Sequence, residues 1–247
     1  MPILESITEP GRLVEFDVEA HTYTDCVTGA KLTSGTTWCK PFKAPFDSDE
    51  IARKCSRDYG WGETPETIAA MWSENGTIAA NFGTALHEVL EYWVKHKAMG
   101  ARIQRRKRKD RNPAYPNHPF LYRLLKDFDA MDPTPKAHIV PEAFISYRNF
   151  CGQIDRLAVL DTKKKVARIQ DYKFNADATK LNKQEYLSRF AHLPTNKVSG
   201  YQMQMSFYAH LMVHCGWTIP GLDALIYDSR WRHVALDVLD LQTGETK

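Results

Sequence analysis

Alternation of apolar and polar positions marks the segments of the chain that we expect to be β-strands. Val14, Phe16 and Val18 alternate with polar residues, and Thr28-Gly29 predicts a hairpin turn after them. The other segments are rich in β-branched and aromatic side chains, which favour strands. The expected strand regions are residues 12–33, 138–147, 152–160, 166–174, 222–228 and 231–239.

Apolar residues at helical spacing predict the helices. Thr64 is expected to cap a helix that has Pro65 in its first turn, and Gly83-Thr84 is expected to open another. The apolar stripe of that second helix is Ala85, Leu86, Val89, Leu90, Trp93 and Val94. Helical patterns cover about 47–99, 120–129 and 199–214. This order of elements predicts an α/β fold with a mixed central β-sheet flanked by helices.

Composition narrows the class of protein without identifying it. The chain has 247 residues, of which 43% are hydrophobic and 26% charged, and its formal net charge is +3. These values exclude a mainly disordered or collagen-like chain. We expect a cytoplasmic location, because there is no targeting signal and no apolar run of the roughly 18 residues that a membrane span requires. The five cysteines are scattered without a Cys-x-x-Cys pair, which disfavours an iron–sulfur cluster, a structural zinc or a disulfide framework.

A single domain is expected over residues 1–247. It would carry an N-terminal β/helical elaboration at about residues 1–80 and a basic, proline-rich insertion at about 100–136. Residues 102–111 of that insertion hold seven positive charges and one negative charge. Such a run is either a solvated surface segment or a grip on a phosphate backbone.

The segment from residue 151 to residue 174 predicts a hairpin that carries two acids. If its loop closes between Asp161 and Lys165, counting outward places Asp155 opposite Asp171, with Cβ atoms about 5 Å apart. Lys173 would then project from the same face as Asp171. A shift of one residue in register would separate the acids. Taken alone, Asp-x-Lys also fits an exposed strand with an ordinary ion pair.

Two helices carry further candidate residues. His87 and Glu91 are four residues apart and share a helix face beside the apolar stripe, which alone fits a surface ion pair or a core histidine bonded to a carbonyl. Tyr201, Gln204 and Tyr208 form one stripe of polar-tipped side chains on the helix at about 199–214. Each stripe in isolation also fits ordinary helix packing.

Together these motifs resemble the RecB-like, phage-type exonuclease branch of the PD-(D/E)XK nuclease superfamily. In chain order they are Gly-x-x-x-His-x-x-x-Glu (Gly83, His87, Glu91), Gly-x-x-Asp (Gly152, Asp155), Asp-x-Lys (Asp171, Lys173) and Gln-x-x-x-Tyr (Gln204, Tyr208). The motifs span residues 83–208, about half of the chain. Members with an iron–sulfur cluster carry several cysteines after the last motif. Only Cys215 lies there, so the chain resembles the branch without a cluster.

The resemblance implies a restriction-endonuclease-like core and a role for each matching residue. His87, Asp155, Asp171 and the backbone carbonyl of Tyr172 would bind one or two Mg²⁺ or Mn²⁺ ions. The catalytic residues would be Asp155, Asp171, Lys173 and Glu91, with Lys173 acting on the attacking water and Glu91 orienting His87. Glu142 would assist a second metal ion. The DNA-binding residues would be Gln204, Tyr208 and Tyr201, together with Arg105, Arg106, Lys107 and Arg108 of the basic run.

The implied activity is metal-dependent hydrolysis of DNA phosphodiester bonds, as an exonuclease in recombination, repair or replication. DNA with single-stranded or double-stranded ends would be the substrate. A recombinase or a single-strand-binding protein would be a possible partner, and no membrane is involved. Two alternatives remain open from the sequence: a structure-specific endonuclease or nickase, and a DNA-binding module that lacks catalysis. The sequence leaves the oligomeric state unknown.

Overall fold

The computed structural model describes residues 1–58, 60, 62–107, 118–174, 178, 180 and 185–246, with the backbone alone for residues 97–107. The strands are β1 (Ile3–Glu5), β2 (Leu13–Asp17), β3 (Thr22–Asp25), β4 (Lys31–Ser34), β5 (His138–Tyr147), β6 (Phe150–Asp161), β7 (Val166–Phe174), β8 (Leu222–Tyr227) and β9 (Trp231–Leu236). The α-helices are α1 (Gly35–Cys39), α2 (Ser48–Asp58), α3 (Pro65–Lys107), α4 (Pro119–Met131) and α5 (Lys197–His214). Short 3₁₀ turns cover Lys40–Phe42 and Ser188–Phe190. Within these described residues, no helix is both long enough and apolar enough to cross a membrane.

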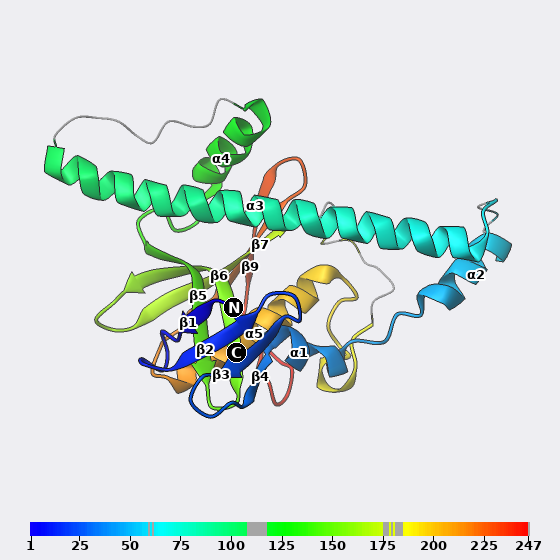
Figure 1. The fold of residues 1–247 in the computed structure, drawn as a ribbon, viewed down its shortest axis with the longest axis horizontal. Helices are drawn as coiled ribbons and strands as arrows, with labels where there is room; N and C mark the ends of the chain where they lie inside the picture. Colours follow the sequence, from blue (N-terminus) through cyan, green and yellow to red (C-terminus); the bar gives the residue numbers. More distant parts are fainter. Residues whose placement is uncertain are drawn as a thin grey trace.

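All described strands join one nine-stranded sheet, which confirms the predicted mixed sheet flanked by helices (Figure 1). Its main path is β1-β2-β3-β4-β6-β7-β8-β9, and β5 pairs with the other edge of β6. The β4–β6 and β7–β8 pairs are parallel, and the remaining pairs are antiparallel. The N-terminal strands therefore extend the sheet that carries the predicted acids.

Helices cover both faces of the sheet. α5 packs on one face in a core that includes Ile169 and Met205, whereas α3 and α4 pack on the opposite face around Tyr172 and Leu90. Side chains alternate between the faces along β7, so Asp171 projects to the same side as Ile169. In Figure 1, α3 crosses the sheet as a long rod, and α5 lies below it against the strands.

The helix predicted to begin at Gly83 is not a separate element, because α3 runs without a break through both Gly76 and Gly83. A glycine inside a helix costs only about 1 kcal/mol relative to alanine, and neighbouring helix formers offset that cost. The predicted start is confirmed: the Thr67 N–H donates to Thr64 Oγ1 at 3.2 Å. Of the predicted stripe, Leu86, Leu90, Trp93 and Val94 are buried.

Two strands share one edge of β6 and leave a gap between them. β4 pairs there with Phe150 and Cys151, and the β7 ladder begins at Arg156. β5 occupies the opposite edge along this whole stretch. Among the described strands, none pairs with Gly152 to Asp155 on the gapped edge, so side chains fill that space.

A buried polar network joins β6, β7 and β8 next to this gap. The Arg156 guanidinium, 2% exposed, donates to Thr134 Oγ1 at 2.9 Å and to Asp132 Oδ2 at 2.7 Å. It also bonds Gln170, whose amide donates to Asp223 on β8 at 2.9 Å. The network links α4, β6, β7 and β8 and holds the strand ends in a defined position.

Candidate active site

The β6–β7 hairpin brings Asp155 and Asp171 side by side, as the sequence predicts. The β6–β7 ladder pairs Arg156 with Gln170 and Val159 with Ala167, which is the predicted register. The predicted loop is one residue too short, because Asp161 pairs with Val166 instead of Lys165. A bulge at Leu160 adds a residue to β6 and restores the register further along.

Asp155 lies where the ladder opens, and its side chain takes the place of a backbone acceptor. The Tyr172 N–H donates to Asp155 Oδ2 at 2.9 Å. The side chain is 16% exposed, and burial is the main reason that the pKa of Asp155 is raised. The charge of Lys173 and the Tyr172 hydrogen bond oppose this shift.

α3 delivers His87 to the same point from the other side of the sheet. His87 Nδ1 lies 3.4 Å from Asp155 Oδ2, and the ring also interacts with the Tyr172 backbone. The rings of Tyr172 and Phe174 contact it edge-on, with centroids 5.7 and 5.5 Å away. Burial, aided by the positive charge of Lys173, lowers the pKa of His87 and favours the neutral ring that can bind a metal.

Asp171 and Lys173 form a close ion pair, and the pKa of each partner is raised. Lys173 Nζ lies 2.5 Å from Asp171 Oδ2, yet this buried oxygen has no hydrogen bond of good geometry within the described part of the chain. Burial raises the pKa of Asp171 to about 6 despite the attraction of Lys173. Burial lowers the pKa of Lys173, but Asp171 and Asp155 outweigh it and leave that pKa raised. The single ammonium of Lys173 therefore interacts with the carboxylates of both Asp171 and Asp155.

Glu142 joins the cluster from β5. It lies between the pairs Pro141–Arg156 and Ala143–Ile154, and therefore opposite Asp155. One ligand atom each from His87, Glu142 and Asp155 lie within 4.8 Å of one another. Burial and the nearby charges of Asp155 and Glu91 raise the pKa of Glu142 to about 8. The sequence assigned it only an accessory part.

The backbone of Glu142 is strained in a way that points its side chain at the site. Its φ is +49°, the left-handed region that non-glycine residues seldom adopt inside a strand. Gln153 Nε2 on β6 donates to Glu142 Oε2 at 2.9 Å and holds the carboxyl group in place. Strain of this kind is maintained only where the surroundings enforce it and is frequent at functional sites.

The Gln-x-x-x-Tyr stripe of α5 braces the site from the other face. Gln204 Nε2 donates to Tyr208 Oη at 2.8 Å, and Tyr208 is buried. Its ring lies so close to Gly35 and Gly152 that a Cβ at either glycine would approach it to 2.5 or 2.2 Å. Tyr208 thus fills the gap beside β6. The ring of Tyr201 faces the Lys173 ammonium, 5.1 Å from its centroid.

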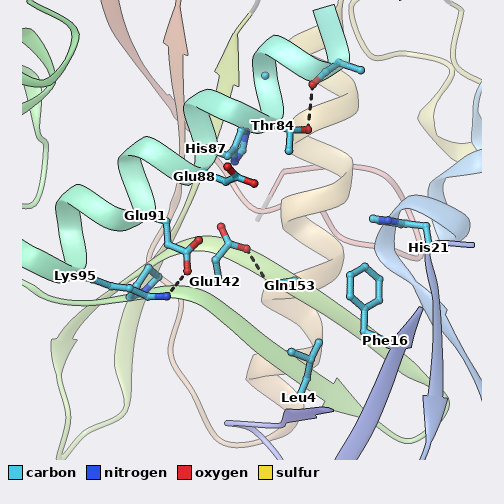
Figure 2. Close-up of a pocket in the computed structure, with 13 residues that line it drawn as sticks. Leu4, Phe16, His21, Thr84, His87, Glu88, Glu91, Lys95, Glu142 and Gln153 are labelled. Atoms are coloured by element: carbon cyan, nitrogen blue, oxygen red, sulfur yellow. Dashed lines mark hydrogen bonds and ion pairs between the residues drawn. The ribbon is translucent and has the colours of Figure 1, made fainter. Parts of the chain in front are cut away.

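The remaining predicted residues lie at the border of this cluster or outside the described side chains. Glu91 forms an ion pair with Lys95 and points toward Glu142, and no contact with His87 is found among the described residues (Figure 2). Arg105, Arg106 and Lys107 belong to the part of α3 whose side chains are not described. Arg108 lies outside the described residues altogether.

A cavity of about 840 Å³ opens directly onto His87 and Glu142. Figure 2 shows α3 as one wall, the N-terminal strands as the facing wall, and Glu142 with Gln153 between them. The facing wall includes Leu4, Phe16 and His21. Sequence reasoning did not identify this wall, because it depends on how strands far apart in the chain join the sheet.

The cluster combines three carboxyl groups, one imidazole and one ammonium, and two of its members, His87 and Glu142, line the cavity. Such a donor set is suited to binding a divalent cation and an anionic substrate. Comparisons of the chain with protein-family models, with curated proteins and with solved structures find no match.

Proposed function

We propose that this protein is a metal-dependent deoxyribonuclease that hydrolyses DNA phosphodiester bonds from strand ends. In this proposal the sheet and α5 form a restriction-endonuclease-like core of the PD-(D/E)XK type. The convergence of His87, Asp155, Asp171 and Lys173 supports the proposal most strongly, because four separate sequence positions meet at one point. Glu142 adds a fifth group that the motif alone does not require.

The side chains of the cluster fit a divalent cation. If Asp155, Asp171 and Glu142 were all ionised, Lys173 would neutralise only one of the three charges. Burial is the largest cause of the raised pKa values of the three acids, and repulsion from Asp155 adds to it for Glu142 and Asp171. The buried Asp171 Oδ2 has no hydrogen bond of good geometry within the described residues, although Lys173 Nζ lies 2.5 Å away, and it would be a ligand of the cation. Oxygen ligands favour Mg²⁺, and the His87 nitrogen makes Mn²⁺ an effective substitute.

The residues around the proposed cation site would have distinct roles in hydrolysis. A divalent cation, once bound, would supply a Lewis acid for the scissile phosphate and increase the acidity of a water molecule. Asp155 and Asp171 hold their carboxylates at the opening between β6 and β7. Lys173, kept protonated by these acids, would orient the attacking water and stabilise the negative charge that develops on the phosphate. Tyr208, hydrogen-bonded to Gln204, packs against Gly152 of β6.

The direct experiment is digestion of end-labelled linear duplex DNA by the full-length protein with Mg²⁺, with Mn²⁺ or with EDTA. We expect labelled mononucleotides or short products only with a metal ion. Asp171→Ala and Lys173→Ala should each reduce the rate by at least about a hundredfold, as is usual when a group that acts in the transition state is removed. If both variants cleave DNA at the rate of the parent protein, the assignment of Asp171 and Lys173 to the active site is wrong.

Lys164→Ala is a matched control for Lys173→Ala. Lys164 lies in the exposed loop of the same hairpin, so its replacement removes one charge without touching the cluster. It should cleave DNA at the parental rate. Covalently closed circular DNA separates the alternatives. Cleavage of circles would show an endonuclease or nickase, and DNA binding without any cleavage would show a non-catalytic module.

A further inference from the structure

The cavity beside the metal-ligand cluster has two chemically different walls. The α3 wall carries His87, Glu88 and Glu91, and Glu142 lies next to them. The opposite wall, formed by the N-terminal strands, carries the rings of Phe16 and His21 (Figure 2). One side is therefore suited to cations and the phosphates that they attract, and the other side to a planar apolar group.

Phe16 is the outer member of an aromatic stack that starts at the buried Phe144. Phe144 on β5 stacks on Tyr23, with centroids 5.8 Å apart and planes at 19°. Tyr23 stacks on Phe16 at 4.6 Å and 20°. Tyr23 and Phe144 are buried, so the position of Phe16 is fixed before any ligand arrives. His21 stands edge-on to Phe16 at 5.2 Å.

We infer that this aromatic wall stacks on the unpaired terminal base of a single DNA strand whose phosphate lies at the metal-ligand cluster. The inference rests on the proposed nuclease function and specifies its substrate as a single-stranded end. A nucleotide has the same division as the cavity, with a planar base at one end and an anionic phosphate at the other. A preformed ring loses little conformational entropy when a base packs on it.

An unpaired base reaches this wall most readily. Bases inside a duplex are covered on both faces by their neighbours, and the terminal base pair exposes one face but brings its partner strand with it. Stacking on aromatic side chains tolerates any base, because every base has a π-face. Phe16 therefore favours single-stranded ends without selecting a sequence.

Binding of short single-stranded oligodeoxynucleotides with the fluorescent base 2-aminopurine tests the inference. One probe carries it at the 5′ terminus, one at the 3′ terminus and one at an internal position, and Ca²⁺ replaces Mg²⁺ to prevent cleavage. We expect fluorescence quenching of one terminal probe by the full-length protein, and little quenching of the internal probe. A blunt duplex with the same terminal base should show no quenching.

Phe16→Leu keeps an apolar side chain of similar volume but removes the ring. It should weaken binding of the quenched probe on the order of tenfold, within the range measured for loss of one stacked base. Phe16→Trp keeps an aromatic ring at this position and should quench the probe as the parent does, unlike Phe16→Leu. A purely structural role of Phe16 would not predict this difference. His21→Asn changes an exposed residue at φ +52°, where asparagine is well tolerated, and should weaken binding by a smaller factor. Circular dichroism checks that each variant is folded.

Parental binding and quenching by both Phe16→Leu and His21→Asn would overturn the inference. So would equal quenching of the terminal and internal probes by the parent protein. These results are separate from those of the cleavage assay. A protein that quenches the terminal probe through Phe16 but never cleaves DNA would retain this site and lose the proposed nuclease function. A nuclease whose kcat and KM are unchanged in Phe16→Leu would keep its function and lose this site.

Discussion

Replacing Gly152 with alanine would force a methyl group into the ring of Tyr208. The added Cβ would lie 2.2 Å from Tyr208 Cε1 and 2.7 Å from Cδ1, far inside van der Waals contact. The ring cannot retreat easily, because it is buried and also lies against Gly35, where a Cβ would approach it to 2.5 Å. Overpacking in a core costs about 1–3 kcal/mol. Loss of the Gln204–Tyr208 hydrogen bond would add about 1 kcal/mol.

Unfolding in urea, followed by tryptophan fluorescence, measures this effect. We expect Gly152→Ala to lower the free energy of unfolding by about 3 kcal/mol, the sum of the strain and the lost hydrogen bond. Gly76→Ala is the matched control, since Gly76 lies in α3 with no neighbouring atom within 4 Å of an added Cβ. That change should instead stabilise the protein by about 0.5–1 kcal/mol, because alanine favours a helix more than glycine does.

A double-mutant cycle with Tyr208→Leu identifies the cause. If the ring creates the cost, the double variant should be more stable than the sum of the single effects predicts, by at least about 1 kcal/mol. Additive effects, or a Gly152→Ala protein as stable as the parent, would refute the close packing of Tyr208 in the gap of β6. The account of how α5 braces the acids would then fail with it.

Three other predictions follow from the ionisable groups. The free energy of unfolding should fall as the pH rises from about 6 to about 8, because Glu142 has a raised pKa of about 8 when folded and keeps its proton only in the folded state over that range. Glu142 should contribute at most about 1.4 kcal/mol per pH unit to this slope in a urea titration, and the slope should be smaller by that contribution in Glu142→Gln. Mn²⁺ should raise the Tm of the parent in a thermal scan, and His87→Ala should abolish most of that rise; an equal rise in both proteins would exclude His87 as a ligand. Asp132→Ala should destabilise the protein by about 3–5 kcal/mol, because it leaves the buried guanidinium of Arg156 without its carboxylate, and a loss below about 1 kcal/mol in the same titration would contradict this.

The hairpin with the two acids was predictable because its register depends on local sequence. Alternation set the faces of β6 and β7, and the charged turn after Asp161 set the approximate point of closure. The bulge at Leu160 could not be read from the sequence. It preserved the predicted pairing only because it offset a loop that was one residue longer than expected.

The sequence could have predicted the cross-strand position of Glu142 but not its backbone conformation. The tight turn between β5 and β6 consists of Arg148 and Asn149, and counting outward from it places Glu142 opposite Asp155. The left-handed backbone of Glu142 has no such signal, since nothing in the sequence marks a glutamate for that conformation. Tertiary contacts impose it, including the hydrogen bond from Gln153.

Long-range packing accounts for the other differences. Glu91 has the helical spacing to contact His87, but Lys95 lies on the same helix face one turn further on and captures its carboxylate. The aromatic wall of the cavity depends on β4 joining β6 across more than a hundred residues of chain. Patterns within one segment contain no information about such a junction.

Crystals of the protein soaked in Mn²⁺ provide the most direct test of the proposed metal-dependent site. Anomalous scattering locates the ion independently of any assumption about activity. The account predicts a peak within coordination distance of Asp155 and Asp171, with His87 or Glu142 as a further ligand. An absence of any peak at these side chains, with the protein saturated in Mn²⁺, would contradict it.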